Sequence, residues 1–221
     1  QAQAALGIDA ASLSPANLIH HILQAPLDLF WNGGIGTYVK ASAESHAEVG
    51  DRANDSLRID AKQLRVRVVG EGGNLGLTQR ARIEAAKNGC RVITDFNDNA
   101  GGVNSSDREV NLKIPLNAEV QSGAMELPAR NRLLESMTEE LAAKVLRDSD
   151  LQTQCICMLA RVAPARLDEH AQLIRMLERS GQLDRAIEFL PDEENIAERR
   201  AAGQGLTMPE LAVLVSYSKM D

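Results

Sequence analysis

The stretch VRVVGEGGNLGLTQRARIEAAKNG, residues 66–89, decides the fold of the first half of the chain. Its β-branched start is typical of a buried strand, and we expect that strand over 64–72. The glycine cluster at its end allows a tight turn. The residues that follow predict a helix over 77–89, with Thr78 as N-cap and an Asn-Gly pair as its stop. A strand, a glycine-rich loop and a helix are therefore expected in direct succession.

Strands and helices are predicted to alternate up to about residue 115. Apolar runs predict further strands over 27–32 and 90–95. A helix is predicted over 16–25, and a weaker one, interrupted by Gly50, over 43–58. Connections of this length suit parallel strands with helices packed on them. The predicted fold class is α/β: a partial Rossmann-like parallel sheet followed by an all-helical segment.

The second half of the chain predicts helices alone. Few glycines follow residue 115, and apolar residues recur at helical spacing. Two prolines are expected to interrupt this pattern: Pro115 should break or kink a helix over 106–120, and Pro164 should mark a break later on. We therefore predict two domains, at 1–115 and 116–221.

Composition excludes several classes of function. The net charge is −7 and aromatic residues make up only 3% of the chain, which argues against a nucleic-acid partner. No apolar run approaches the roughly 20 residues that span a bilayer, so no membrane partner is expected. An odd number of cysteines without a disulfide pattern suggests a reducing compartment, and we predict a cytoplasmic protein. The first residue is Gln1 rather than methionine, which hints at a piece of a longer protein.

Glycine clusters follow all three predicted strands, at 32–36, 70–73 and 99–103. Each has an asparagine beside it: Asn32, Asn74 and Asn99. The carboxyl ends of parallel strands meet at one edge of a sheet, where ligands bind. An asparagine amide both donates and accepts, which suits a carboxamide or a ribose hydroxyl. Ordinary turns use the same residue types, so a small-molecule site and plain turns both remain open.

Other conspicuous residues are expected to be structural. We predict no metal site, because His46 diverges from Glu44 and Glu48 on a helix. Trp31 is expected to pack under the edge of the sheet, and Lys40 and Lys113 to be surface or packing residues. A local ion pair between Arg52 and Asp55 is a further hypothesis.

Long motifs of the chain resemble the large bacterial NAD-specific glutamate dehydrogenases. They are WNGGIGTYVKASAESHAEVGDRANDSLR, VVGEGGNLGLTQRARIE, TDFNDNAGGVNSSDREVNLKI and GLTMPELAVLVSYSK, and the resemblance covers about 20–221. Shorter glutamate dehydrogenases are more distantly similar. They carry a Glu-Gly-Ala-Asn motif that matches 71–74, with Gly73 in place of alanine. They also carry an Asn-Ala-Gly-Gly-Val motif that matches 99–103, followed by a serine that matches Ser106.

The resemblance implies the oxidation of L-glutamate to 2-oxoglutarate and ammonia, with hydride passing to NAD. It places Asn74 near the nicotinamide ribose or carboxamide, and Asn99 and Gly101 along the nicotinamide side of the cleft. Val103 and Ser106 would face the substrate, with the Ser106 hydroxyl donating to the side-chain carboxylate of glutamate. The implied cofactor-binding residues are Gly33, Gly34, Gly72, Gly73, Asn74, Asn99 and Gly101.

The resemblance also implies what the chain lacks. The lysine and aspartate that carry acid–base catalysis in the family precede the matched region, so no catalytic residue is assigned here. The chain would be a fragment covering the C-terminal part of the NAD-binding domain (1–115) and a helical segment (116–221), inactive alone. The complete enzyme is expected to be a homo-oligomer. The alternative is a non-catalytic helical interaction or regulatory module.

Overall fold

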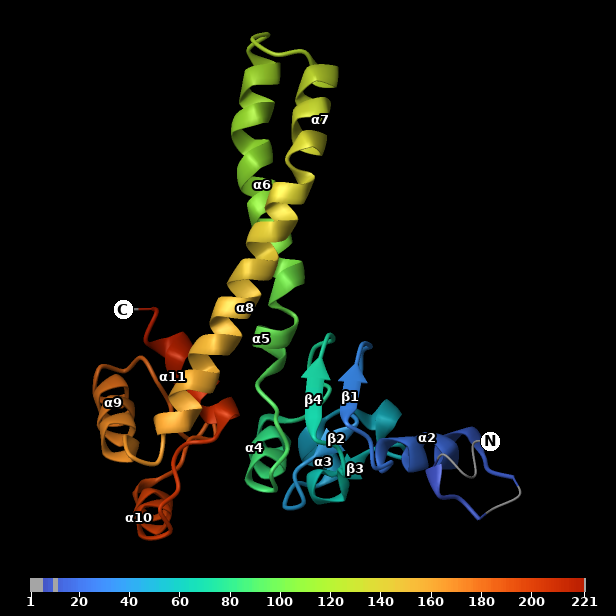
Figure 1. The fold of residues 1–221 in the computed structure, drawn as a ribbon, viewed down its shortest axis with the longest axis vertical. Helices are drawn as coiled ribbons and strands as arrows, with labels where there is room; N and C mark the ends of the chain where they lie inside the picture. The colour runs from blue at the N-terminus through green and yellow to red at the C-terminus, as the bar shows by residue number, and fades with distance from the viewer. Residues whose placement is uncertain (1–5, 10–11, 221) are drawn as a thin grey trace.

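The computed structural model describes residues 6–9 and 12–220, and Figure 1 shows the arrangement of its elements. In chain order these are α2 (Pro15–Leu23), β1 (Leu29–Asn32), β2 (Val39–Lys40), α3 (His46–Val49), η1 (Arg52–Asn54), β3 (Ile59–Asp60), η2 (Ala61–Gln63), β4 (Val68–Glu71), α4 (Gln79–Lys87), α5 (Asp95–Asp98), α6 (Ala100–Gln121), α7 (Leu127–Ser136), α8 (Thr138–Val162), α9 (Leu167–Arg179), α10 (Glu193–Ala201) and α11 (Met208–Tyr217).

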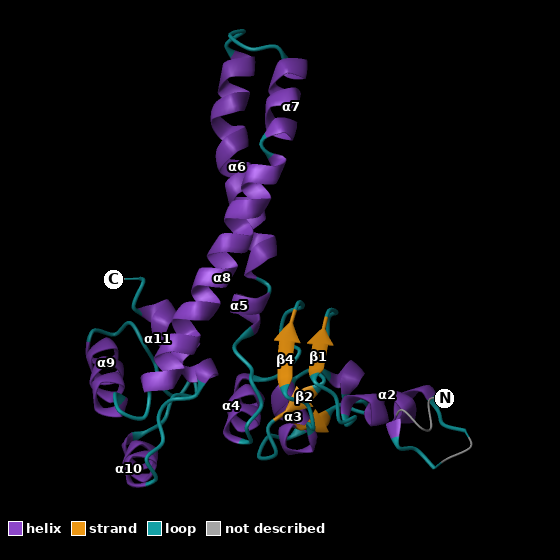
Figure 2. Cartoon of the chain, in the orientation of Figure 1, coloured by secondary structure: helices purple, strands orange, loops and turns teal. Residues whose placement is uncertain are grey.

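The described residues are mostly helical and include a small parallel sheet. β1 pairs with β4 in parallel, in a register that places Leu29 opposite Val68 and Asn32 opposite Glu71. A second parallel pair, β2 with β3, lies beside it and was not expected from the sequence. Figure 2 shows these strands gathered in one region, with α3 among them and α4 and α2 beside them. This arrangement is consistent with the predicted α/β class, whereas the Rossmann-like topology stays a prediction.

The third predicted strand, over 90–95, is wrong except at one residue. Arg91 forms a parallel bridge to Val68, and its carbonyl accepts the Val69 N–H at 2.9 Å. The chain then leaves the sheet, because the buried Thr94 hydroxyl donates to Asn97 Oδ1 at 2.7 Å and α5 begins at Asp95. A side-chain bond of this kind offers the backbone an alternative to the strand ladder.

The weak helix predicted over 43–58 forms only in part, and the interruption predicted at Gly50 is confirmed. Only α3 and the short η1 form there. Ser45 and Glu48 make a capping box at the start of α3, and Gly50 ends it in the left-handed conformation at φ 77°. Glycine adopts this conformation without a Cβ clash, so the helix stops where the sequence places it.

Helices α6, α7 and α8 form a long arm that projects away from the sheet (Figure 1). The break expected at Pro115 is absent, because α6 runs through it without interruption. Pro115 and Asn111, whose carbonyl would accept from residue 115, are both exposed, so water can replace the missing bond. The domain boundary predicted near 115 therefore falls inside α6.

Helices α9, α10 and α11 pack around the far end of α8 (Figure 1). The break expected at Pro164 is confirmed, since α8 ends at Val162. Two separate apolar clusters result. One contains residues of 163–214, including Ile174, and the other contains residues of 23–92, including Leu77. A small third cluster of Ile93, Ile156 and Ala212 lies between them.

A buried ion pair holds the last two helices together. Arg199 of α10 donates to both carboxylate oxygens of Glu210 of α11, each at 2.7 Å. Glu210 also accepts from the N–H and hydroxyl of Thr207, completing a capping box. A Cβ at Gly205 would lie 2.4 Å from the Ala163 carbonyl carbon, so glycine is required there. The conspicuous GLTMPE sequence is thereby accounted for by packing.

None of the helices in the described ranges is both long and apolar enough to cross a membrane.

Candidate functional site

The three glycine-rich loops meet at the carboxyl ends of β1 and β4. The Gly73 N–H donates to the Asn32 carbonyl at 3.1 Å, which joins the first two loops. The Asn99 side-chain amide donates to Asn74 Oδ1, which joins the second and third. We call this edge, formed by 32–36, 70–76 and 95–101, the rim. The sequence predicted that Asn74 and Asn99 lie together, and the structure places them in contact.

Several rim glycines accommodate other parts of the chain. A Cβ at Gly72 would lie 2.4 Å from the Trp31 ring, and one at Gly70 would lie 2.7 Å from it. A Cβ at Gly73 would lie 2.4 Å from the Gly34 carbonyl oxygen. Lack of a side chain at these positions therefore allows the loops and the indole to pack closely. Close approach of a ligand is not needed to explain them.

Trp31 was expected to pack under the edge of the sheet, and this prediction is wrong. Its side chain lies over Gly70 and Gly72, and the residue is 59% exposed. Trp31 and Leu29, two residues apart on β1, are both exposed and stand on the same face of the sheet. The outer face of the indole is therefore open in this structure.

Two of the remaining predicted cofactor residues, Gly34 and Gly101, leave space at the rim. A Cβ at Gly34 would meet nothing within 4 Å, and one at Gly101 would make only an ordinary contact with Val145 at 3.8 Å. Gly33 is exposed and lies beside the Trp31 nitrogen. Asn74 is exposed, whereas Asn99 is half-buried.

The two predicted substrate residues follow the rim along α6. Val103 is 73% exposed and Ser106 is exposed, and they are three residues apart, so they share one face of the helix. At the rise of an α-helix they lie about 6 Å and about 10 Å along the axis from Asn99. The Ser106 hydroxyl makes no hydrogen bond to another described residue, so it is free to donate to a ligand.

A buried charge cluster beneath the rim was missed by the sequence reasoning. The Arg82 guanidinium, from α4, donates to both oxygens of Glu71 at 2.6 and 2.9 Å and lies 3.2 Å from Asp95 Oδ1. Glu71 is fully buried and Arg82 is 3% exposed. Charged residues in the interior of a domain are rare unless paired, and the acidic residue in GEGGN was the one available signal.

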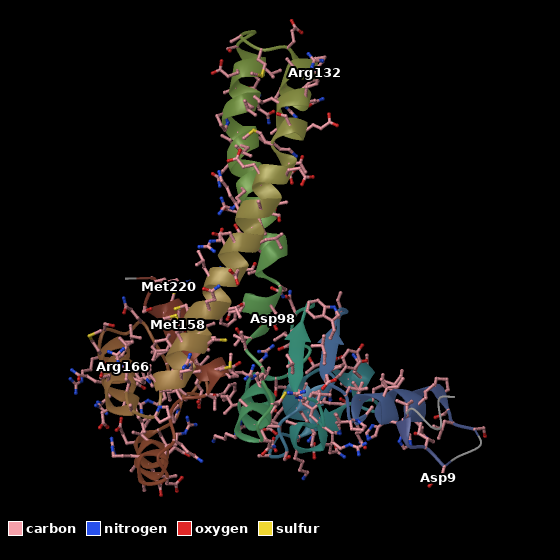
Figure 3. The ribbon with its side chains drawn as sticks, in the orientation of Figure 1. Asp9, Asp98, Arg132, Met158, Arg166 and Met220 are labelled. Carbon is pink, nitrogen blue, oxygen red and sulfur yellow. The ribbon has the colours of Figure 1, made fainter. Side chains whose placement is uncertain are left out.

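Asp98 adds a third carboxylate to this cluster. It accepts the Glu71 N–H at 2.9 Å, and Figure 3 labels it near the end of β4 and the base of the arm. Burial raises the pKa of the Asp98 carboxyl, and the hydrogen bond from Glu71 opposes that effect. Burial also disfavours the charged form of Arg82, but the hydrogen bond and charge of Glu71 prevail and raise the Arg82 pKa.

One buried donor at the rim lacks a partner. Among the described residues, no group accepts from the Asn32 Nδ2 atom, although Asn32 is only 6% exposed. A Cβ at Gly76 would lie 1.7 Å from that nitrogen. Gly76 therefore allows the loop to close over the Asn32 amide.

The DRAND segment, residues 51–55, clamps the first loop. Asp51 accepts the Thr37 N–H at 2.9 Å, and the buried Arg58 donates to the Thr37 carbonyl at 2.8 Å. The ion pair suggested between Arg52 and Asp55 does not form, because Asp55 pairs with Arg58 at 2.6 Å instead. This segment thus holds the chain just after Gly36 in place.

Lys40 and Lys113, which the sequence predicted to be surface or packing residues, are both held in ion pairs. Lys40 is buried and ion-paired with Asp60, and Lys113 pairs with Glu109 one turn away on α6. In the part of the chain that the structure describes, no three His, Cys, Asp or Glu side chains are grouped so as to hold a metal ion.

Comparison with known proteins supports a single family. Residues 1–159 match the family described as bacterial NAD-glutamate dehydrogenase, catalytic domain. The chain belongs to this family. It is 56% identical over 219 residues to the NAD-specific glutamate dehydrogenase of Pseudomonas aeruginosa and 52% identical over 219 residues to that of Halomonas elongata. It is 47% identical over 226 residues to that of Mycobacterium tuberculosis.

These matches cover 99–100% of the chain but only 14% of each relative. The chain is thus a small part of the length of a bacterial NAD-glutamate dehydrogenase. NAD is the cofactor named for all three relatives. The family match ends near the end of α8, so it includes the sheet, the rim and the arm.

The rim of this bacterial NAD-glutamate dehydrogenase chain has groups that fit the nicotinamide end of NAD. The exposed Asn74 uses its Oδ1 for Asn99, and its Nδ2 makes no hydrogen bond within the described ranges. That amide donor and the open space above Gly34 suit a carboxamide or a ribose hydroxyl. The fit concerns only one end of the dinucleotide.

Proposed function

We propose that the chain forms part of the NAD site and one edge of the substrate site of an NAD-dependent glutamate dehydrogenase. The observation that carries this proposal is the contact between Asn74 and Asn99 at the rim. Family membership supplies the reaction: L-glutamate, NAD and water give 2-oxoglutarate, ammonia and NADH. When bound, NAD accepts the hydride from the Cα of glutamate.

The chain's own residues would bind and orient the reactants. The cofactor residues are Gly33, Gly34, Gly72, Gly73, Asn74, Asn99 and Gly101. The Asn74 amide would donate to the nicotinamide carboxamide or ribose, and so fix the face of the ring that meets the substrate. Val103 and Ser106, on the exposed face of α6, would line the substrate side. The Ser106 hydroxyl would donate to the side-chain carboxylate of glutamate.

Acid–base catalysis is assigned to parts of the complete enzyme outside this chain. Lys40 and Lys113 are both ion-paired, and neither is assigned a catalytic role. The purified chain is therefore expected to form no NADH from L-glutamate and NAD, whereas the complete gene product that contains it should do so. Turnover by the purified chain would contradict the assignment. Assembly of the complete enzyme as a homo-oligomer stays a prediction.

Cofactor binding at the rim can be measured through Trp31. It is the only tryptophan of the chain and covers Gly70 and Gly72. We expect NADH to quench its emission by energy transfer, and Asn74→Ala to weaken this binding about tenfold because it removes a hydrogen-bond donor. Asn131→Ala, an exposed asparagine on the arm, is the matched control and should bind as the wild type does.

Two outcomes would count against the proposal. Equal titration curves for Asn74→Ala and the wild type would remove Asn74 from the site. Absence of NADH binding by both the chain and the complete gene product would favour the alternative, a non-catalytic helical interaction module.

A further inference from the structure

The buried charge cluster makes its hydrogen bonds to the backbone of the rim. Asp95 Oδ2 accepts the Leu75 N–H at 2.8 Å, and Glu71 Oε1 accepts the Leu77 N–H at 3.0 Å. Together with the bond from the Glu71 N–H to Asp98, these carboxylates hold three amides between residues 71 and 77. The cluster therefore determines the path of the loop that carries Asn74.

The loop needs this support, because its backbone is strained beside Asn74. Leu75 has φ 56°, in the left-handed region that non-glycine residues rarely occupy. Such a conformation persists only where surrounding contacts enforce it. The contact that enforces it here is the bond from the Leu75 N–H to Asp95, and Asp95 is in turn held by Arg82.

Within the described ranges, Arg82 is the one cation that pairs with both Glu71 and Asp95. It bonds Glu71 of β4 through both oxygens and lies within ion-pair distance of Asp95 at the start of α5. Its Nη1 also donates to Gln79 Oε1 at 3.3 Å. The planar fork of arginine can serve two carboxylates at fixed angles, whereas a lysine ammonium cannot.

We propose that Arg82 is a positioning residue for the cofactor, which acts through Glu71 and Asp95 to hold Asn74 and Asn99 in register at the rim. This inference rests on the proposed function of the rim. Arg82 itself touches no cofactor in this scheme. Its effect is transmitted by the two carboxylates and the backbone amides that they hold.

The chain contains a matched control for this role. Arg199 is also buried and also bonds both oxygens of a buried glutamate, Glu210, but it joins α10 to α11, away from the rim. Arg82→Lys and Arg199→Lys are the same chemical change in comparable buried pairs. Both are expected to lower the melting temperature, so stability alone does not distinguish them.

The first measurement uses steady-state kinetics of the complete gene product. Arg82→Lys is expected to raise the KM for NAD by up to about tenfold, the loss expected when the Asn74 hydrogen bond is removed outright, and to leave the KM for L-glutamate nearly unchanged. Arg199→Lys should leave both KM values unchanged. This split between substrates is an effect that a general loss of stability does not produce.

The second measurement requires no turnover. Hydrogen–deuterium exchange of the chain without cofactor should show faster exchange at the Glu71, Leu75 and Leu77 amides in Arg82→Lys, but not in Arg199→Lys. NADH titration through Trp31 should then show weaker binding in Arg82→Lys alone.

Each result decides between the two proposals. Equal KM values for NAD in the two variants, or unchanged exchange at those three amides in Arg82→Lys, would overturn the role of Arg82 and leave the proposed function intact. If the wild-type gene product binds no NADH, both proposals fail together.

Discussion

At the scale of single residues, the rim shows how a glycine can be required by the protein itself. Gly76 lies against the Asn32 amide, and Gly73 lies against the Gly34 carbonyl. Neither position has room for a methyl group, whatever ligand binds above. Gly102, at the start of α6, has nothing within 4 Å of the place a Cβ would take. The glycines in and beside the three clusters therefore differ in what they do.

This difference predicts opposite effects for the same substitution. Gly76→Ala places a methyl group 1.7 Å from Asn32 Nδ2, and we expect it to lower the free energy of unfolding by about 1–3 kcal/mol. Gly102→Ala should raise it by up to about 1 kcal/mol, because alanine favours the helix and meets no neighbour. Chemical denaturation of both variants measures the difference. A Gly76→Ala protein as stable as the wild type would mean that Asn32 is not confined as described.

At the scale of elements, α9 carries a titratable group on its buried face. His170 is 9% exposed, and its Nδ1 has no hydrogen-bond partner within the described ranges. It borders a small cavity of about 170 Å³ with apolar side chains of α8 and α11, among them Leu159 and Leu214. Burial lowers the pKa of His170, the charge of Arg166 lowers it further, and Glu169 opposes both.

The lowered pKa predicts a loss of stability in acid. The folded protein disfavours the charged imidazole, so the unfolded chain binds the proton more readily once the pH falls below its ordinary value of about 6.5. The contribution of neutral His170 is complete above that pH and is lost as the pH falls towards the folded-state pKa. Melting temperatures between pH 8 and pH 5 should fall less for His170→Leu than for the wild type. Parallel curves would contradict this account.

At the scale of the whole molecule, the described residues form two main apolar cores. Helix α4 packs on one core and α11 on the other, and the two helices contact each other. One contains Leu77 and the other Ile174, and both side chains are fully buried. Several contacts link them: those between α4 and α11, the small cluster around Ile156, the Arg80 guanidinium 5.4 Å from the centre of the Phe189 ring, and a hydrogen bond from Gln79 to the Pro209 carbonyl at 3.4 Å. Glu71 and Arg82, of the charge cluster that supports the rim, lie on β4 and α4, and these elements also contribute Val69 and Ala81 to the first core.

The separation of the cores predicts regional effects of core substitutions. Leu77→Ala and Ile174→Ala should each cost about 2–5 kcal/mol, through lost burial and the cavity left behind. Hydrogen exchange should then accelerate mainly over 23–92 in the first variant and mainly over 163–214 in the second. Uniform acceleration across the chain in either variant would show that the two cores unfold as one unit.

The elements that were predicted well are those with strong local signals. Helix α4 begins after Thr78, whose side chain accepts the Ala81 N–H at 3.0 Å, and ends before Gly89 at φ 90°. The wrong elements were decided by local features that the apolar pattern does not show. The Thr94 side chain turns the chain out of the sheet through its bond to Asn97, three residues on, and α6 continues through Pro115, where Asn111 and Pro115 are both exposed.

The sequence by itself determined the order of the main strands and helices, because turn residues and periodicity are local signals. Its long motifs determined the family. It also determined that Asn74 meets Asn99, because the ends of parallel strands lie at one edge of a sheet. Only the tertiary structure decided which glycines lie against the Trp31 ring and the Asn32 amide. It alone paired Arg82 with Glu71 and Asp95, and Arg58 with the Thr37 carbonyl. Charges and ring positions of this kind depend on where separate segments meet after folding, and no spacing along the chain specifies that.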